Sequence, residues 1–157
     1  FSIPYAIYYA QAVVNKDSGI KTVEDMRNKK VAAAIGTVPE QEWLKIAKKW
    51  GVEANYQGYQ SENQVFLAVS QGKADVGITT NTAVLPIVQQ YETILAGPRM
   101  PWGTDYTSVV GPRLDVTWLN YLNLFVTHQV RSGRYAELWD QYVGGEAPEL
   151  RIPGVLY

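Results

Sequence analysis

The chain has 157 residues, of which 46% are hydrophobic and 18% are charged, and its formal net charge is −1. This composition allows a packed core and argues against intrinsic disorder. Lysine and arginine are spread along the chain, whereas a nucleic-acid surface needs a basic patch, so we expect no nucleic-acid partner. Polar residues interrupt every apolar stretch well before the length of a membrane span, so no transmembrane segment is predicted.

The sequence contains no cysteine and one histidine, His128. Disulfides, thiol nucleophiles and thiolate metal sites are therefore excluded, and one histidine cannot build a metal cluster by itself. Neither a metal nor another cofactor is predicted. An enzyme would need a nucleophile with its base, or two carboxylates with separated pKa values, and the sequence offers no such set. We therefore expect a protein without catalytic residues.

The amino-terminal residues 1–9 are aromatic and extended, because Pro4 excludes a helix. Alternation of residue types predicts a strand over 10–15. Thr22 is expected to cap a short helix that ends near Asn28.

The segment 30–40, KVAAAIGTVPE, has the most informative local pattern of the chain. Its apolar run predicts a buried strand over Val31–Ile35, with a tight turn at Gly36. Thr37 is the expected N-cap of a helix that has proline and glutamate in its first turn and ends near Trp50. Backbone N–H groups at such a turn can hold a carboxylate or phosphate, although a plain, well-capped turn has the same pattern.

Two more strand–helix pairs follow this segment. The patterns predict strands over 52–56 and 74–79, and helices over 61–72 and 80–91. Strands separated by helix-length crossovers pair in parallel with helices over the sheet, which predicts the α/β class. Ligands of such sheets bind at the carboxyl ends of the strands, so Gly36–Thr37 and Thr79–Thr80 are expected to face one site.

The last third of the chain has fewer strands. The patterns predict a strand over 93–96, a Pro/Gly-rich loop over 97–103, an extended segment over 105–110, a short helix over 135–143 and a tail over 146–157. Asp115 or Thr117 is expected to cap a long helix that continues to Gly133. Its apolar stripe consists of Trp118, Leu122, Phe125 and Val126.

Four stretches occur in a familiar order: FSIPY, KDSGIKTVEDMRNKKVAAAIGT, QGKADV and RSGRYAELWDQYVGG. Together they resemble the extracytoplasmic solute-binding proteins of family 3, the polar amino-acid binders of ABC importers. The resemblance runs through nearly the whole chain. It implies the type II periplasmic-binding-protein fold, in which two α/β lobes close on a small polar, amino-acid-like solute. It also implies a periplasmic location and an ABC permease as partner.

The resemblance further implies a domain organisation. Residues 1–9 correspond to a hinge strand, and 10–103 correspond to the second lobe, a three-layer αβα unit with a mostly parallel sheet. Residues 104–157 correspond to the return strand, helices and tail of the first lobe, whose opening elements have no counterpart. We therefore expect a fragment with a cut or trimmed start at Phe1. Its helix at 118–130 would lack a cover, so we expect self-association through that helix.

Six residues are candidate ligand contacts: Gly36, Thr37, Val38, Thr79, Thr80 and Tyr5. By resemblance, Gly36 and Thr37 match the family's turn at the ligand carboxylate. Two positions depart from the family pattern, because Val38 replaces a hydroxyl residue and Thr80 replaces the acidic residue that holds the ligand's amino group. Each threonine equally suits an ordinary role as a helix cap or strand end.

Three aromatic residues are candidate rings of the site: Tyr5, Tyr59 and Trp102. Asp75 and Asn81 are expected to have structural roles. Two other functions use the same fold and stay open at this point. One is a ligand-sensing module of a receptor or kinase, and the other is a dehydratase-like enzyme with a catalytic acid in the first lobe.

Overall fold

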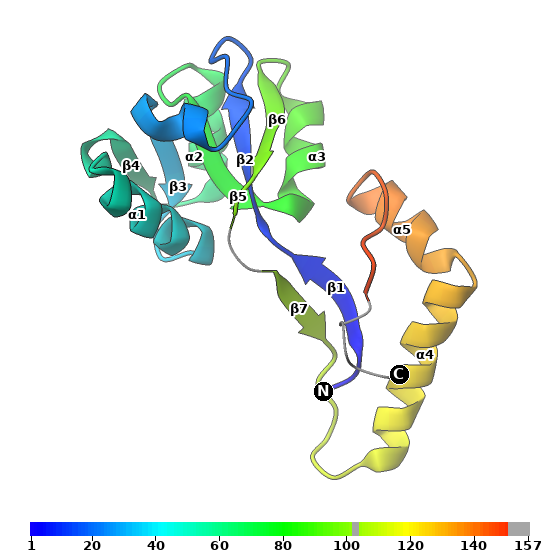
Figure 1. Ribbon diagram of the computed structural model, residues 1–157. Helices are drawn as coiled ribbons and strands as arrows, with labels where there is room; N and C mark the ends of the chain where they lie inside the picture. The colour runs from blue at the N-terminus through cyan, green and yellow to red at the C-terminus, as the bar shows by residue number, and fades with distance from the viewer. Residues whose placement is uncertain (102–103, 151–157) are drawn as a thin grey trace. The chain divides into compact units, whose positions relative to one another are not determined.

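The computed structural model describes residues 1–101 and 104–150. The chain divides into two compact units (Figure 1). One consists of Tyr9–Gly103, and the other of Phe1–Tyr8 with Thr104–Tyr157. In the described part, no helix has the length and apolar character needed to cross a membrane.

The larger unit is built on a five-stranded sheet with the order β4-β3-β5-β2-β6. Its strands are β2 (Ala10–Asn15), β3 (Val31–Ala34), β4 (Tyr56–Tyr59), β5 (Val76–Thr80) and β6 (Ile94–Arg99). β3 pairs in parallel with β4 and β5, whereas β2 pairs antiparallel with β5 and β6. Only β2 therefore runs against the other four, because the chain enters this sheet at the end where β3, β4 and β5 stop. We call this end the carboxyl end of the sheet.

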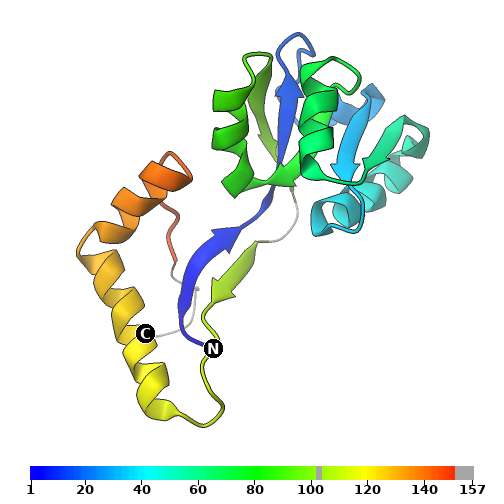
Figure 2. The ribbon, with the colours of Figure 1, turned by 180° about the vertical axis from the view of Figure 1, so that it is seen from behind.

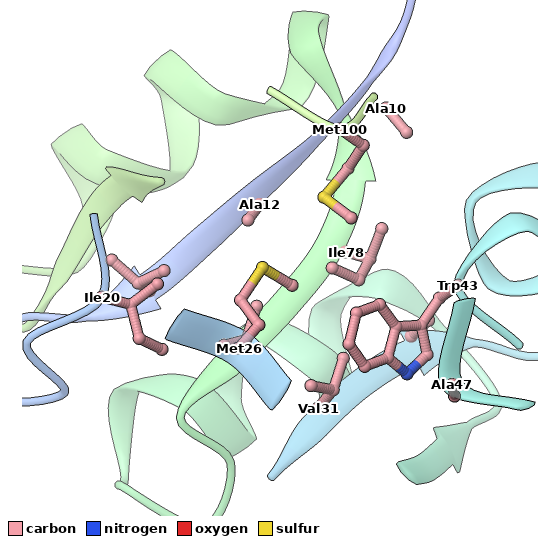
Figure 3. Close-up of a cluster of buried hydrophobic side chains, with 12 residues drawn as sticks. Ala10, Ala12, Ile20, Met26, Val31, Trp43, Ala47, Ile78 and Met100 are labelled. Carbon is pink, nitrogen blue, oxygen red and sulfur yellow. The ribbon is translucent and has the colours of Figure 1, made fainter. Parts of the chain in front are cut away.

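Helices cover both faces of the sheet, as the αβα prediction requires. Successive residues of β3 alternate between two cores: Val31 and Ala33 pack with Trp43 of α1 (Val38–Trp50), and Ala32 and Ala34 pack on the opposite face. The side chains of the first core are drawn in Figure 3. On the opposite face lie α2 (Glu62–Ser70) and α3 (Asn81–Gln90), which stand in front of the sheet in Figure 2.

Local signals placed most of these elements correctly. α1 begins after Thr37 and ends at Gly51, whose φ of 69° is the left-handed conformation that favours glycine at a helix end. The predicted strand over 52–56 is wrong: a 3₁₀ turn, η2 (Glu53–Asn55), precedes β4. The strand forms later because pairing with β3 selects its register, although YQGY has little apolar character of its own. A second 3₁₀ helix, η1 (Glu24–Asn28), follows Thr22.

The smaller unit combines a two-stranded ribbon with two helices. β1 (Pro4–Tyr8) pairs antiparallel with β7 (Asp105–Ser108), and α4 (Val116–Arg131) and α5 (Arg134–Tyr142) follow. Asp115, not Thr117, caps α4, because its Oδ1 accepts a hydrogen bond from the Trp118 N–H at 2.8 Å. Of the predicted stripe, Leu122 and Val126 are buried, whereas Trp118 and Phe125 are 44% and 51% exposed.

Candidate functional site

At the carboxyl end of the sheet, β3, β4 and β5 each run into a turn, while β2 begins and β6 ends there. Ala33 of β3 lies opposite Ile78 of β5, so these neighbouring strands end side by side. In the antiparallel pairs, Ala10 of β2 lies beside Thr80 of β5, and Gln11 of β2 lies beside Arg99 of β6. Five predicted contacts, Gly36, Thr37, Val38, Thr79 and Thr80, therefore belong to two adjacent strand ends. The sixth, Tyr5, belongs to the smaller unit and is 39% exposed.

The β3–α1 turn is hydrogen-bonded internally. Gly36 has a φ of 81°, and its N–H donates to Glu40 Oε2 at 2.6 Å. The Thr37 hydroxyl donates to the Ala34 carbonyl at 2.7 Å and accepts from the Glu40 N–H at 3.3 Å. The prediction that backbone N–H groups of this turn are available to a ligand is thus wrong for Gly36 and Thr37. The Gly36 N–H donates to Glu40, and the Thr37 N–H donates to the Ala34 carbonyl. In the described part of the chain, the Val38 N–H has no acceptor.

Glu40 links this turn to β4, because both of its carboxylate oxygens accept hydrogen bonds. It is 9% exposed, and its second carboxylate oxygen accepts a hydrogen bond from the Tyr56 hydroxyl at 2.5 Å. Burial raises the pKa of Tyr56, and the hydrogen bond to Glu40 and its negative charge raise that pKa further. Tyr56 is therefore protonated at neutral pH and donates to Glu40. The sequence places Glu40 in the first turn of the helix, where its side chain can accept a hydrogen bond from the backbone just before the helix. Its hydrogen bond with Tyr56 of β4 depends on strand pairing, which the local pattern does not show.

The β5–α3 turn contains one buried and one accessible threonine. Thr79 is fully buried, and its hydroxyl donates to Glu62 Oε1 at 2.9 Å. A direct side-chain contact from Thr79 to a ligand, as predicted, is therefore not available in this structure. Thr80 is partly exposed and occupies the N-cap position of α3, with its hydroxyl 3.3 Å from that of Thr82.

Sequence reasoning missed Arg99, the part of the site that comes from β6. The buried Asn81 side chain accepts a hydrogen bond from the Tyr9 N–H at 3.2 Å, and the Asn81 N–H donates to the Tyr9 carbonyl at 3.0 Å. The guanidinium of Arg99 lies 4.1 Å from the centre of the Tyr9 ring, within cation–π range. Tyr9 and Arg99 are far apart in sequence, so no local pattern indicated this contact.

Other candidates lie elsewhere or have structural roles. Tyr59 packs against the core under α2, and Trp102 lies outside the described residues. Asp75 accepts a hydrogen bond from the Lys30 N–H at 2.8 Å, at the opposite end of the sheet. His128 is exposed on α4, and residues 1–101 and 104–150 contain no cluster of three His, Asp or Glu side chains that would hold a metal ion.

A protein-family model matches residues 5–115, and it is described as "ABC transporter, phosphonate, periplasmic substrate-binding protein". The chain belongs to this family. The match takes in the whole five-stranded sheet and every turn at its carboxyl end. The predicted kinship with the solute-binding proteins of ABC transporters is thereby confirmed, although this family's description names phosphonate.

Individual relatives are similar to this chain over different lengths. The probable extracellular-binding protein YckB of Bacillus subtilis is 37% identical over 78 residues, 48% of this chain and 26% of that protein. The L-cystine-binding protein TcyJ of Escherichia coli is 26% identical over 93% of this chain and 54% of its own length. An ancestral arginine-binding protein bound to arginine has 26% identity and a TM-score of 0.64, covering 92% of this chain and 64% of that one.

These comparisons confirm the α/β fold of solute-binding proteins. The relatives are named as binding proteins, not as enzymes. The chain spans about half, or less, of the length of the curated relatives it matches.

Proposed function

We propose that this chain binds a small amino-acid-like solute at the carboxyl end of its sheet, for delivery to an ABC permease outside the cytoplasm. The observation that carries the proposal is that β3 and β5 end side by side, with the Val38 N–H and the Thr80 hydroxyl on their two turns. Neighbouring strands lie about 5 Å apart, so one small molecule can reach both turns. Ligands of α/β sheets bind at this end of the strands.

The ligand class is inferred from the relatives and from the turn. TcyJ is named for L-cystine and the ancestral protein for arginine, which supports an amino acid or a related carboxylate. Glu40 already accepts the hydrogen bond of the Gly36 N–H, so the Val38 N–H at the α1 start is the donor proposed for the ligand carboxylate. Thr37 shapes the turn, and the contact of Tyr5 with a ligand stays a prediction.

The proposed mechanism is binding and release without a chemical step. In a two-lobed binding protein, the solute is held when the lobes close, and the affinity depends on the difference between the open and closed states. We assign residues 10–103 to one lobe and residues 1–9 to the hinge. The only histidine is exposed on a helix, and the chain has no cysteine to act as a nucleophile.

The proposal is tested by nuclear magnetic resonance of the ¹⁵N-labelled chain, and of the whole encoded protein if the gene is longer. L-arginine, L-glutamine, L-citrulline and methylphosphonate are titrated separately. We expect at least one amino acid to shift the amide resonances of Val38 and Thr80, while those at the opposite end of the sheet, such as Lys30, stay unchanged. Shifts with methylphosphonate alone, or no shift at the carboxyl end in either protein, would contradict amino-acid binding.

A further inference from the structure

The carboxyl end of the sheet contains a carboxylate that the proposed function has not used. Glu62 is the first residue of α2 and follows β4 closely in the chain. Its Oε1 accepts the hydrogen bond of the Thr79 hydroxyl at 2.9 Å, and Thr79 is fully buried one residue before Thr80. A hydroxyl held in the core thus fixes the position of this carboxylate at the carboxyl end of the sheet.

The charge of Glu62 is not balanced within the described part of the chain. The ion pairs of residues 1–101 and 104–150 join Lys45 to Glu42 and Arg134 to Glu137, and Glu62 is in neither. Its second oxygen, Oε2, has no hydrogen-bond donor among these residues. Glu40, the other carboxylate at this end of the sheet, is different, because each of its oxygens accepts a hydrogen bond.

The position of Glu62 is partly shielded from water. Glu62 is partly buried, so fewer water molecules screen its charge than on an open surface. The positive end of the α2 dipole stabilises the negative form of a side chain in the first turn. A carboxylate held in one position, with one oxygen unpartnered, is a suitable acceptor for an N–H group that carries positive charge.

We infer that Glu62 is the contact for a positively charged group on the side chain of the ligand, an ammonium or a guanidinium. This inference rests on the proposed function, and it adds a specificity-determining residue to the site. The Val38 N–H and Glu62 would then hold opposite charges of one molecule. The ordinary alternative is that Glu62 only starts α2 and accepts the hydrogen bond of Thr79, and this alternative predicts no discrimination between ligands with charged and with neutral side chains.

The test is a substitution that removes the charge and keeps the shape. In Glu62→Gln, the amide oxygen still accepts the Thr79 hydrogen bond, so only the negative charge is lost. Glu53→Gln is the matched control, because Glu53 is exposed and precedes β4, at the opposite end of the sheet. The probes are L-arginine and L-citrulline, which have nearly the same shape, but only arginine carries a side-chain charge. Dissociation constants are measured by the same amide titration for each protein.

We expect Glu62→Gln to weaken arginine binding by at least about tenfold. Citrulline binding should change less than twofold, and Glu53→Gln should leave both ligands unaffected. Equal losses for arginine and citrulline, or unchanged arginine binding, would overturn the inference while leaving amino-acid binding in place. If the unmodified protein shows no shift at the carboxyl end with any amino acid, the proposed function fails and the inference falls with it.

Discussion

Glu40 is a buried carboxylate that joins the β3–α1 turn to β4. It accepts hydrogen bonds from the Gly36 N–H and from the Tyr56 hydroxyl. A buried charge that loses one of its donors keeps its desolvation cost, so the missing bond is expensive. This turn is consequently held in one conformation before a ligand arrives, and we expect Tyr56 to matter for stability.

Tyr56→Phe removes one donor to Glu40 and should lower the free energy of unfolding by about 1–3 kcal/mol at pH 7. Urea unfolding measures this change. Tyr135→Phe is the matched control, because the Tyr135 hydroxyl is buried without a hydrogen-bond partner among the described residues, and its loss should cost almost nothing. Equal destabilisation by the two substitutions would contradict the role assigned to the Tyr56–Glu40 bond.

The same urea unfolding, repeated at alkaline pH, gives an independent check. Burial is the main cause that raises the pKa of Tyr56 in the folded chain, followed by Glu40, and burial with the nearby Tyr8 raises the pKa of Tyr135 to about 12. Both groups hold their protons more tightly when folded. Ionisation of either group therefore destabilises the folded chain, and this loss begins as the pH rises above the unfolded pKa of about 10. Each phenylalanine variant should therefore lose less stability between pH 10 and pH 12 than the unmodified chain.

At the scale of elements, the packing of α2 on the sheet depends on a glycine in β5. A Cβ added at Gly77 would lie 2.9 Å from a methyl group of Val65 and 3.0 Å from one of Val13. Both neighbours are buried in the core and cannot move aside easily. The missing side chain of Gly77 therefore lets α2 lie close to the sheet, which keeps Glu62 within reach of β5.

Gly77→Ala should destabilise the larger unit by about 1–3 kcal/mol, because it overpacks a filled core. Gly58→Ala, in β4, is the comparison outside the core: its Cβ would lie 2.8 Å from Ile35, which is 52% exposed, and 3.1 Å from the Tyr56 hydroxyl, so we expect a smaller loss there. Thermal unfolding compares the two variants. A loss at Gly58 as large as that at Gly77 would show that close packing under α2 is not the cause.

The elements also show how much the sequence could predict. α1 was predicted with its bounds because its signals are local: Thr37 caps it and Gly51 ends it within a few residues of chain. The start of β4 was not predicted, because pairing with β3 decides where this strand begins. The same division applies to the site. The two strand ends followed from the βαβ order, whereas the bond between Glu62 and Thr79 joins residues whose contact depends on how α2 packs.

At the scale of the whole molecule, the smaller unit leaves many apolar side chains open to solvent. On α4, Trp118 and Tyr121 stack with ring centres 5.2 Å apart, and both are exposed. Leu124 and Phe125 of the same helix are 70% and 51% exposed. A contiguous apolar surface of this kind marks an interaction site more often than a free surface.

We therefore propose that the chain in isolation self-associates through α4, which light scattering with size-exclusion chromatography measures directly. Leu124→Glu with Phe125→Lys should shift the chain to monomers, because the paired substitution puts two charges on the helix without changing net charge. Leu67→Glu is the control, since Leu67 is also an exposed leucine, 46% accessible, but it lies on α2 of the other unit. A monomeric unmodified chain at all concentrations would contradict the proposal. Equal dissociation caused by Leu67→Glu would also contradict the proposal, because the contact between chains would then not belong to α4.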